Sequence, residues 1–419
     1  MRRLYLALLA GLFALSAPAA AALIPEPGWL VSDNPVGWTP HVLDGEVRAL
    51  AVVGDTVVVG GDFTSVTDHA GRKKRDFSFL FAFQFGTGKV LNFSPWLDGP
   101  VLALEPGPDN TVYVGGRFRH VGDRKQRGIA QVDLATGKPV KEFAASIGWG
   151  DVRAIARSHG KLYIGGTFED VSGIPRAGLA RLDATTGAVD EFDAHLSADE
   201  LGRVKVEDLA VSPNGDRMMV IGALTEVGGA YRAQAAMFDL TPEQPQLADW
   251  WTRAFDHRCR DGFDTWLRAV DFSPDGSYLV IVTTGRHSRP ELLCDTAARF
   301  ETYAVGETGA TWVNHTGGDS LYAVEISNHA VYVGGHQRWM DNPYGDESAG
   351  PGAIDREGLA AIDPDSGLAN DWNPTRKRGI GARALLLTDR GLLVGSDTDE
   401  LAHEYHGRLG LFPFRSGSG

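Results

Sequence analysis

Polar residues directly follow a repeated glycine-glycine pair, and their side chains are the first candidates for chemistry. The pair ends a short apolar run in VVVGGDF at 57–63, VYVGGRF at 112–118, LYIGGTF at 162–168 and VYVGGHQ at 331–337, with eroded copies at 219–224, 281–286 and 392–397. The residues that follow the pairs are Asp62, Arg117, Thr167, Leu224, Arg286, His336 and Asp397. Acids, bases and an imidazole at equivalent positions suit either a site for an anionic or sugar ligand or a ring of charges that neutralise one another.

The longest irregular segment, at 337–358, adds aromatic and polar side chains to this set. Mixtures of aromatic rings, carboxylates and amides are typical of surfaces that recognise carbohydrate or peptide. The alternative is a surface loop that packs on itself with its tryptophan inside. The candidate ligand-binding residues are therefore Asp62, Arg117, Arg286, His336, Arg338, Trp339, Asp341 and Tyr344.

A third group of candidates lies in SDTDELAHEYHGR at 396–408. Its carboxylates and imidazoles suit zinc or calcium ions, so the candidate metal ligands are Asp397, Asp399, His403 and His406. We predict no other cofactor. The sequence contains no CxxC, HExxH, GxSxG or Walker-type loop, and we therefore predict no catalytic residue.

Cys259 and Cys294 are the two cysteines of the chain. In an exported protein, two cysteines favour one disulfide over two free thiols. Both fall in loops of one repeat, before and after the apolar run at 278–283. The bridge either pre-organises two binding loops or simply stabilises them.

The elements that must position these residues belong to a repeat of about 50–60 residues. Its best copy contains four apolar runs, VRAIAR, KLYIGGTF, LARLDA and AVDEFD, between 152 and 193. Runs of this kind, separated by turn signals, predict four β-strands. Recurring acids at the last turn (Asp133, Asp183, Asp239, Asp363) and recurring arginines before the third strand (Arg127, Arg176, Arg232, Arg356) predict structural contacts, the arginines with backbone carbonyls.

Seven copies predict an all-β fold, a single seven-bladed β-propeller of four-stranded antiparallel blades over 37–414, with a lead-in at 23–36 and a flexible tail at 415–419. The last copy lacks a fourth strand. GWTPHV at 37–42 supplies it beside 408–414, so that the N-terminal strand near Trp38 closes the ring. One aromatic residue in each blade is predicted to pack between blades: Phe93, Phe143, Phe192, Trp250 or Trp251, Trp312, Trp372 and Trp38.

The motifs VYVGGxFxxV, R-x-G-LARLD and TG-x-V, followed by a terminal Phe or Trp, resemble the bacterial delta-60 or DUF5122 β-propeller repeat over nearly all of 38–414. The resemblance implies an exported bacterial protein, often actinobacterial, in a family without a general activity. LDATTG at 182–187 also resembles the quinoprotein dehydrogenase repeat. Those enzymes have a larger ring and often adjacent cysteines, which this chain lacks.

The N-terminus predicts export. Arg2 and Arg3 precede an apolar run and small residues, the pattern of a secretory signal peptide over 1–22. No cysteine follows this run and no later stretch could span a bilayer, so we expect neither a lipid anchor nor a membrane span. Loss of the two arginines takes the net charge from −14 to −16, which disfavours nucleic acid as a partner. We expect a secreted monomer.

Strand order places the connections between second and third strands, and between successive blades, on one face of the ring. Irregular loops on a rigid scaffold are where binding sites are usually built. We therefore predict a non-catalytic binding or scaffold protein that recognises an extracellular glycan or protein through this loop-rich face. The alternative is a carbohydrate- or lactone-acting hydrolase or lyase with a site at the channel mouth. The repeat is eroded in blades four, five and seven, and blades five and six carry long loops. We therefore expect the binding site on the arc of the ring that these blades form.

Overall fold

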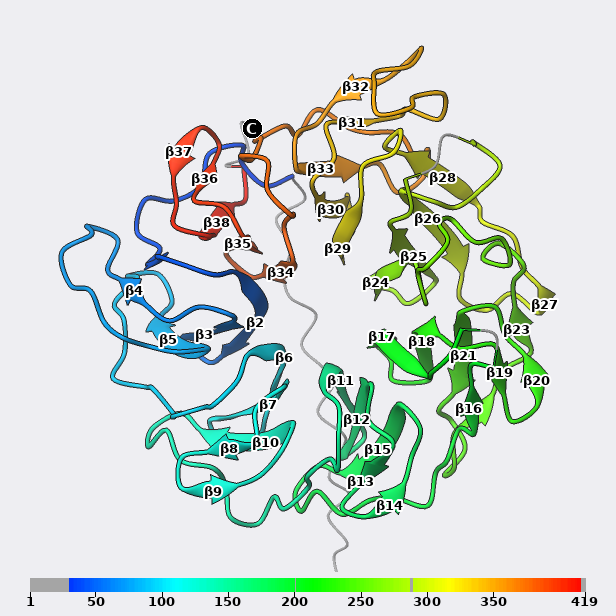
Figure 1. The fold of residues 1–419 in the computed structure, drawn as a ribbon. Helices are drawn as coiled ribbons and strands as arrows, with labels where there is room; N and C mark the ends of the chain where they lie inside the picture. The colour runs from blue at the N-terminus through cyan, green and yellow to red at the C-terminus, as the bar shows by residue number, and fades with distance from the viewer. Residues whose placement is uncertain (1–29, 200, 287–288, 416–419) are drawn as a thin grey trace, which may run out of the picture.

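The computed structural model describes residues 30–199, 201–286 and 289–415. All regular elements in these ranges are β-strands, and seven of the sheets contain three or four strands. Figure 1 shows these sheets standing around a central axis in chain order. Among the described residues there is no helix long and apolar enough to cross a membrane. The predicted signal peptide, residues 23–29 of the lead-in and the last four residues of the tail lie outside the described ranges.

The seven sheets are numbered one to seven in chain order. Their strands are β2 (Val47–Val53), β3 (Thr56–Gly61) and β5 (Leu80–Gln84); β6 (Val101–Pro106), β7 (Thr111–Gly116) and β10 (Ile129–Asp133); β11 (Val152–Ser158), β12 (Lys161–Gly166) and β15 (Leu179–Asp183); β17 (Lys205–Val211), β18 (Arg217–Ala223), β21 (Ala235–Asp239) and β22 (Gln246–Leu247); β24 (Leu267–Phe272), β25 (Tyr278–Thr283), β26 (Thr296–Glu301) and β28 (Trp312–His315); β29 (Leu321–Ile326), β30 (Val331–Gly335) and β33 (Leu359–Ile362); and β34 (Ala384–Thr388), β35 (Gly391–Gly395) and β38 (Leu409–Pro413).

Two-residue strands decorate the loops between these sheets. They are β1 (His41–Val42) with β4 (Val66–Thr67), β8 (His120–Val121) with β9 (Arg124–Lys125), β13 (Asp170–Val171) with β14 (Ile174–Pro175), β16 (Leu196–Ser197) with β19 (Glu226–Val227) and β20 (Ala230–Tyr231), β23 (Trp250–Trp251) with β27 (Gly306–Glu307), β31 (Trp339–Met340) with β32 (Ile354–Asp355), and β36 (Glu400–Leu401) with β37 (Glu404–Tyr405). Most of them form small hairpins between a second and a third strand.

The predicted fourth strand is short in most sheets. Sheets four and five have one, β22 and β28. In sheets one, two, three and six the corresponding segment makes a single bridge to the third strand. The outer edge of the ring is therefore less regular than the repeat predicts.

The chain ends meet at sheet seven. Val31 forms a bridge with Phe414, and hydrogen bonds from residues 31–36 follow β38. Backbone hydrogen bonds to β38 therefore come from 31–36. Within the predicted segment 37–42, the hydroxyl of Thr39 donates to the carbonyl of Leu409, and the amide of Val42 donates to the carbonyl of Gly407, just before β38. Residues from Trp38 onward already turn toward sheet one. In the sequence of 31–42, the prolines and the glycine do not indicate which half of the stretch pairs with β38.

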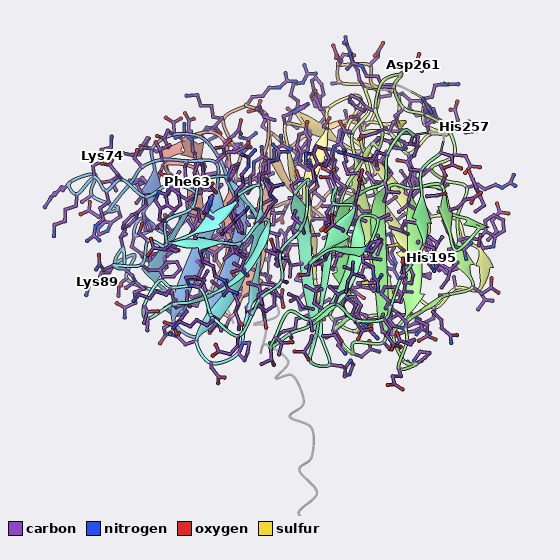
Figure 2. All side chains as sticks on the ribbon, turned by 60° about the horizontal axis from the view of Figure 1, so that its bottom comes forward. Phe63, Lys74, Lys89, His195, His257 and Asp261 are labelled. Atoms are coloured by element: carbon purple, nitrogen blue, oxygen red, sulfur yellow. A yellow bond between two sulfur atoms is a disulfide. The ribbon has the colours of Figure 1, made fainter. Side chains whose placement is uncertain are left out.

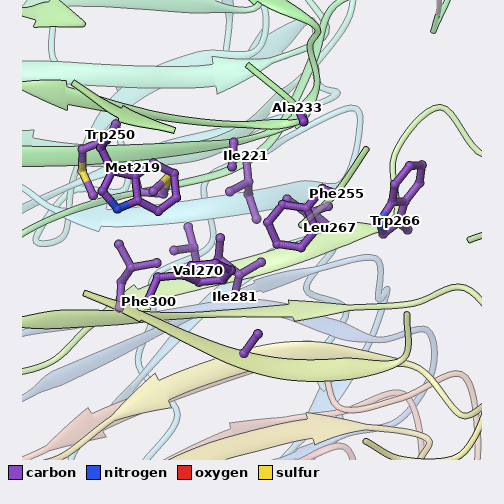
Figure 3. Close-up of a cluster of buried hydrophobic side chains, with 14 of the residues drawn as sticks. Met219, Ile221, Ala233, Trp250, Phe255, Trp266, Leu267, Val270, Ile281 and Phe300 are labelled. Carbon is purple, nitrogen blue, oxygen red and sulfur yellow. The ribbon is translucent and has the colours of Figure 1, made fainter. Parts of the chain in front are cut away.

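Aromatic rings pack between neighbouring sheets, as predicted. The ring pairs are Trp38–Phe85, Tyr113–Phe143, Phe192–Phe238, Trp250–Phe300 and Trp372–Phe412, with centroids 5.5–6.2 Å apart. Each pair contributes about 0.5–1.5 kcal/mol beyond the apolar area it buries. Trp250, rather than Trp251, is the buried member of its pair of tryptophans. Figure 3 shows it with Met219 and Phe300 in the cluster between sheets four and five.

The glycine pairs let backbone and side chains approach closely. A Cβ on Gly60 would lie 2.5 Å from Cγ1 of Val101 in the next sheet. A Cβ on Gly61 would lie 2.0 Å from the carbonyl oxygen of Glu46, in the loop that enters the same sheet. The pair is thus a packing requirement of the ring.

Candidate ligand-binding face

The long loops gather on one face of the ring, which we call the loop-rich face. In Figure 2, Lys74, His257 and Asp261, all from such loops, lie along the upper edge of the molecule. Lys89, from the turn after a third strand, lies below.

Strand register changes two of the predicted equivalences. The pairing of β17 with β18 makes Ala223, and not Leu224, the equivalent of Asp62. The pairing of β24 with β25 makes Thr284, and not Arg286, the equivalent in sheet five. In sheet four the surviving Gly222 is the second member of the pair and not the first, and in sheet five Gly285 lies two residues beyond the second position. Alignment of either glycine with the wrong position of the pair shifts the register.

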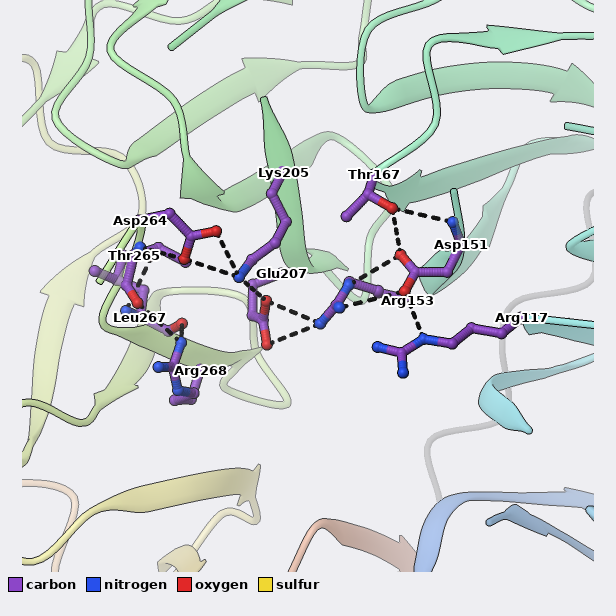
Figure 4. A network of polar contacts seen from close by, with 10 residues as sticks. All are labelled: Arg117, Asp151, Arg153, Thr167, Lys205, Glu207, Asp264, Thr265, Leu267 and Arg268. Carbon is purple, nitrogen blue, oxygen red and sulfur yellow. Dashed lines mark hydrogen bonds and ion pairs between the residues drawn. The ribbon is translucent and has the colours of Figure 1, made fainter. Parts of the chain in front are cut away.

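Ion pairs form a chain around one side of the channel mouth (Figure 4). The carboxylate of Asp151 accepts Nε of Arg117 at 2.9 Å and Nε of Arg153 at 3.1 Å. Arg153 also reaches Glu207 at 3.2 Å. Burial opposes ionisation of Asp151, but the charges of Arg153 and Arg117 and a hydrogen bond from Thr167 hold its pKa below the usual range.

The chain of charges continues into sheet five. Lys205 lies 3.2 Å from Glu207 and 3.0 Å from Asp264. Its cations and acids alternate from Arg117 to Asp264, so their charges largely cancel. Of the two interpretations of these polar residues, this arc matches the self-neutralising ring.

The remaining mouth residues of sheets six and seven are also engaged. Asp319 accepts Arg338 at 2.7 Å and Arg378 at 3.0 Å. His336 accepts the amide of Ser320 at 3.2 Å through Nε2, and its Nδ1 contacts a backbone carbonyl at 2.8 Å. Asp397 accepts Arg376 at 3.0 Å and two backbone amides. These candidates hold loops in place.

Four arginines from equivalent positions line a cavity of about 290 Å³ on the ring axis. They are the second residues of VRAL, VRAI, LRAV and ARAL in sheets one, three, five and seven: Arg48, Arg153, Arg268 and Arg383. From the sequence, these segments were interpreted only as the starts of strands. The recurrence of arginine at their second position is the pattern that could have revealed this shared site. Glu46 pairs with both Arg48 and Arg383, and the ring of Tyr322 lies 4.1 Å from the Arg383 guanidinium.

Inner-strand carboxylates stitch sheets four to seven together. Asp208 accepts the amide of Val270 at 3.0 Å, and Asp271 accepts the amide of Ile326 at 2.8 Å. Glu325 continues the series by accepting an amide of sheet seven at 2.9 Å. Withdrawal from bulk water raises the pKa of Asp208 and of Asp271 to about 7, and raises that of Glu325 further above its ordinary value.

The predicted disulfide is confirmed. Cys259 and Cys294 are bonded, with Cα atoms 5.6 Å apart and a sequence separation of 35. Beyond the bridge, Arg286 pairs with Glu347 at 2.7 Å. The loops of sheets five and six are thus tied internally and to each other.

The long loop of sheet six packs mostly on itself. Asp341 accepts the side chain of Asn314 at 2.5 Å and the amide of Ala369 at 3.1 Å. Trp339 is covered by the guanidinium of Arg338, 4.3 Å from its ring. Tyr344 alone among the candidates of this loop is largely exposed, at 69%. The alternative of a self-packed loop describes most of this segment.

The candidate metal ligands are used separately. Asp399 pairs with Lys377 at 3.3 Å, and His403 contacts the hydroxyl of Thr375 at 3.1 Å. Burial lowers the pKa of His406, which lies 3.7 Å from Glu404. Within the described ranges, no three His, Cys, Asp or Glu side chains are grouped so that they could hold a metal ion.

The recurring arginines bind backbone carbonyls, as predicted. Arg176 donates to the carbonyl of Asp190 at 2.7 Å, and Arg127, Arg232 and Arg356 make comparable contacts. The recurring acids accept turn amides, as Asp183 does from Thr186 at 2.8 Å. These residues belong to the repeat and not to a site.

A cationic cavity of about 360 Å³ lies between sheets two and three on the loop-rich face. Its lining includes five arginines and one acid: Arg117, Arg119, Arg127, Arg153, Arg203 and Asp151. We call it the arginine pocket. Asp151 already neutralises two of the arginines. Trp149, which is 55% exposed, completes the wall and carries the guanidinium of Arg203 4.5 Å from its ring. Of this lining, only Arg117 and Thr167 were among the residues that follow the glycine pairs, and only Arg117 was a candidate ligand-binding residue from the sequence.

A second cavity of about 360 Å³ lies between sheets four and five on the same face. Its lining combines apolar side chains with acids: Leu224, Phe255, Trp266, Asp199, Glu226 and Asp256, among others. We call it the apolar pocket. Leu224, displaced from the position predicted for it, lies buried here. The two pockets therefore have equal volumes, but in the second one three acids line the cavity with a single arginine, Arg258.

Antiparallel sheets arranged around an axis define a β-propeller. Residues 158–191 match the family model described as "Domain of unknown function (DUF5122) beta-propeller", so the resemblance predicted from the repeat is confirmed for this segment. The chain is similar to the computationally designed Ika8 protein in its crystal structure, with a TM-score of 0.49 and 13% identity over 92% of this chain and 100% of that one. No curated protein matches the sequence.

Proposed function

We propose that the chain is a secreted, seven-bladed β-propeller that binds an extracellular glycan or protein through its loop-rich face without catalysing a reaction. The observation that carries this proposal is the arginine pocket, a preformed cavity on a rigid ring whose guanidinium groups exceed what the fold neutralises. The N-terminal signal pattern and the disulfide support export. Contacts of residues 31–36 with β38 support a closed ring of seven blades.

One observation favours the alternative of a carbohydrate- or lactone-acting hydrolase or lyase. Asp208 and Asp271 have pKa values near 7, and carboxyl groups with raised pKa values often act as general acids. Here, however, both carboxylates accept amides of the neighbouring inner strand. The raised pKa values are explained by burial in these contacts between sheets and do not require a catalytic role. The binding protein is therefore the favoured function.

The test uses the chain without residues 1–22 on arrays of extracellular glycans and cell-surface proteins. We expect specific binding of at least one array member, with no new reducing ends or ring-opened products released from it. Product release that disappears in the variant Asp271→Asn would replace the proposal with the enzyme. The absence of any binding partner would remove support for both.

A further inference from the structure

We infer that the arginine pocket binds an acidic saccharide, with its carboxylate or sulfate groups held by Arg119, Arg127 and Arg203 and a sugar ring against Trp149. This inference rests on the proposed function, because it names the ligand class of the same face. It also moves the expected site from blades five and six, which the loop lengths favour, to blades two and three.

The arginine pocket carries more positive charge than its own carboxylate neutralises. In the described part of the chain, no carboxylate pairs with the guanidinium groups of Arg119, Arg127 or Arg203. Arg127 spends one donor on the carbonyl of Gly148, at 2.6 Å. The remaining donors of the three side chains form a concentrated cationic wall on a protein whose net charge is −14. Guanidinium groups bind carboxylate and sulfate through two parallel hydrogen bonds, which a lysine cannot make.

The floor of the pocket explains why only these three arginines are open to a ligand. Asp151 is 5% exposed and accepts Arg117, Arg153 and the hydroxyl of Thr167, at 2.7 Å for the hydroxyl. Arg153 is further engaged by Glu207. The network fixes the floor and compensates its charge. An incoming anion would therefore be held by the rim.

The aromatic wall selects the body of the ligand. Trp149 keeps 55% of its surface exposed, whereas most large aromatic residues of the ring are buried. It is placed by Gly150, where a Cβ would lie 2.7 Å from the carbonyl oxygen of Thr167. Gly150 also has a φ of +89°, a conformation that favours glycine. An indole held at the edge of a polar pocket suits the apolar C–H face of a sugar ring.

The size of the pocket favours a short ligand segment over a long polyanion. A volume of about 360 Å³ is at the small end of ligand sites and suits one or two sugar rings. Binding along a nucleic acid backbone requires a stripe of cations, and the net charge of −14 opposes it. A terminal or internal acidic unit of an oligosaccharide fits the small volume and does not need a stripe of cations.

The test is calorimetric titration of the chain without residues 1–22. The probes are trigalacturonic acid for carboxylate, a heparin-derived tetrasaccharide for sulfate, and maltotriose as the neutral comparison. The variants are Arg119→Gln, Arg203→Gln and Trp149→Ala. Arg72→Gln is the matched control, since it removes the same charge from an exposed loop of sheet one. Thermal melting of each variant checks that it is folded.

We expect one acidic probe to bind at least about tenfold more tightly than maltotriose. Each arginine variant should weaken that binding about tenfold, and Trp149→Ala about fivefold, while Arg72→Gln leaves it unchanged. Which acidic probe binds tells carboxylate from sulfate recognition.

Three results would overturn the inference. They are equal binding of maltotriose and the acidic probes, equal binding by wild type and the pocket variants, and no binding of either acidic probe at millimolar concentration. If an array partner from the previous test still binds wild type and variants alike, the proposed function stands and only the acidic-saccharide inference fails.

Discussion

The arginine pocket and the loops of blades five and six show two different uses of one face. Blades five and six carry the longest loop, the disulfide and the link between Arg286 and Glu347. Nearly every polar candidate there is paired. Blades two and three follow the repeat closely and have short hairpins, yet they leave cations unpaired around a cavity. Loop length and cross-linking thus report how a segment is stabilised, whereas surplus charge around a cavity reports where a ligand could be held.

The apolar pocket sharpens this comparison because its volume equals that of the arginine pocket. There the residue equivalent to Asp62 is uncharged, and buried Leu224 and Trp266 line the cavity together with acids. Acidic saccharides should avoid that lining. The arginine pocket and the apolar pocket therefore differ in the charge of their linings but have the same volume.

The largest effect is expected from removing the disulfide. The double variant Cys259→Ser and Cys294→Ser opens a loop of 35 residues, and it should lower the free energy of unfolding by about 3 kcal/mol, because the unfolded chain gains freedom. Urea denaturation measures the change. Binding of the acidic probe at the arginine pocket should be unaffected. A parallel loss of that binding would contradict the separation of the two regions.

A smaller effect is expected from pH. The folded-state pKa of Asp271, about 7, lies above the ordinary value of 3.8, so the neutral form is favoured by folding. The stabilisation linked to this carboxyl is complete below about pH 4 and is lost as pH rises through 7. The free energy of unfolding should therefore decrease by on the order of 1–2 kcal/mol between pH 6 and pH 8 from Asp271 alone, with Asp208 contributing in the same direction.

The variant Asp271→Asn tests this assignment. It removes the titration, so its stability should change less between pH 5 and pH 9 than that of the wild type. It should also be less stable than wild type at pH 5, because the amide cannot accept both the Phe272 and Ile326 amides. If the free energy of unfolding depends on pH in the same way in the variant and the wild type, a group other than Asp271 causes that dependence.

Sequence reasoning predicted the parts of the molecule that repeat. The stacked sheets, the aromatic packing between them, the carbonyl contacts of Arg176 and its relatives and the disulfide all follow from periodicity or composition. The register in sheets four and five could not be predicted, because only one glycine remains to align in each of them. In sheet five this displaces the predicted mouth position by two residues, from Thr284 to Arg286. The arginine pocket was missed for a different reason. Its residues come from four separate segments, and only folding shows that Arg203 lies against Trp149.

The smallest effect is expected from Tyr344→Ala. Tyr344 is 69% exposed on a loop whose neighbours Asp341 and Asn342 hold its shape through buried hydrogen bonds. Its loss should change the free energy of unfolding by less than about 0.5 kcal/mol. If blades two and three carry the site, binding of the acidic probe should also stay the same, whereas Trp149→Ala weakens it. Titration of the two aromatic variants side by side decides between the regions, because loss of binding in Tyr344→Ala alone would return the site to the loop of blade six.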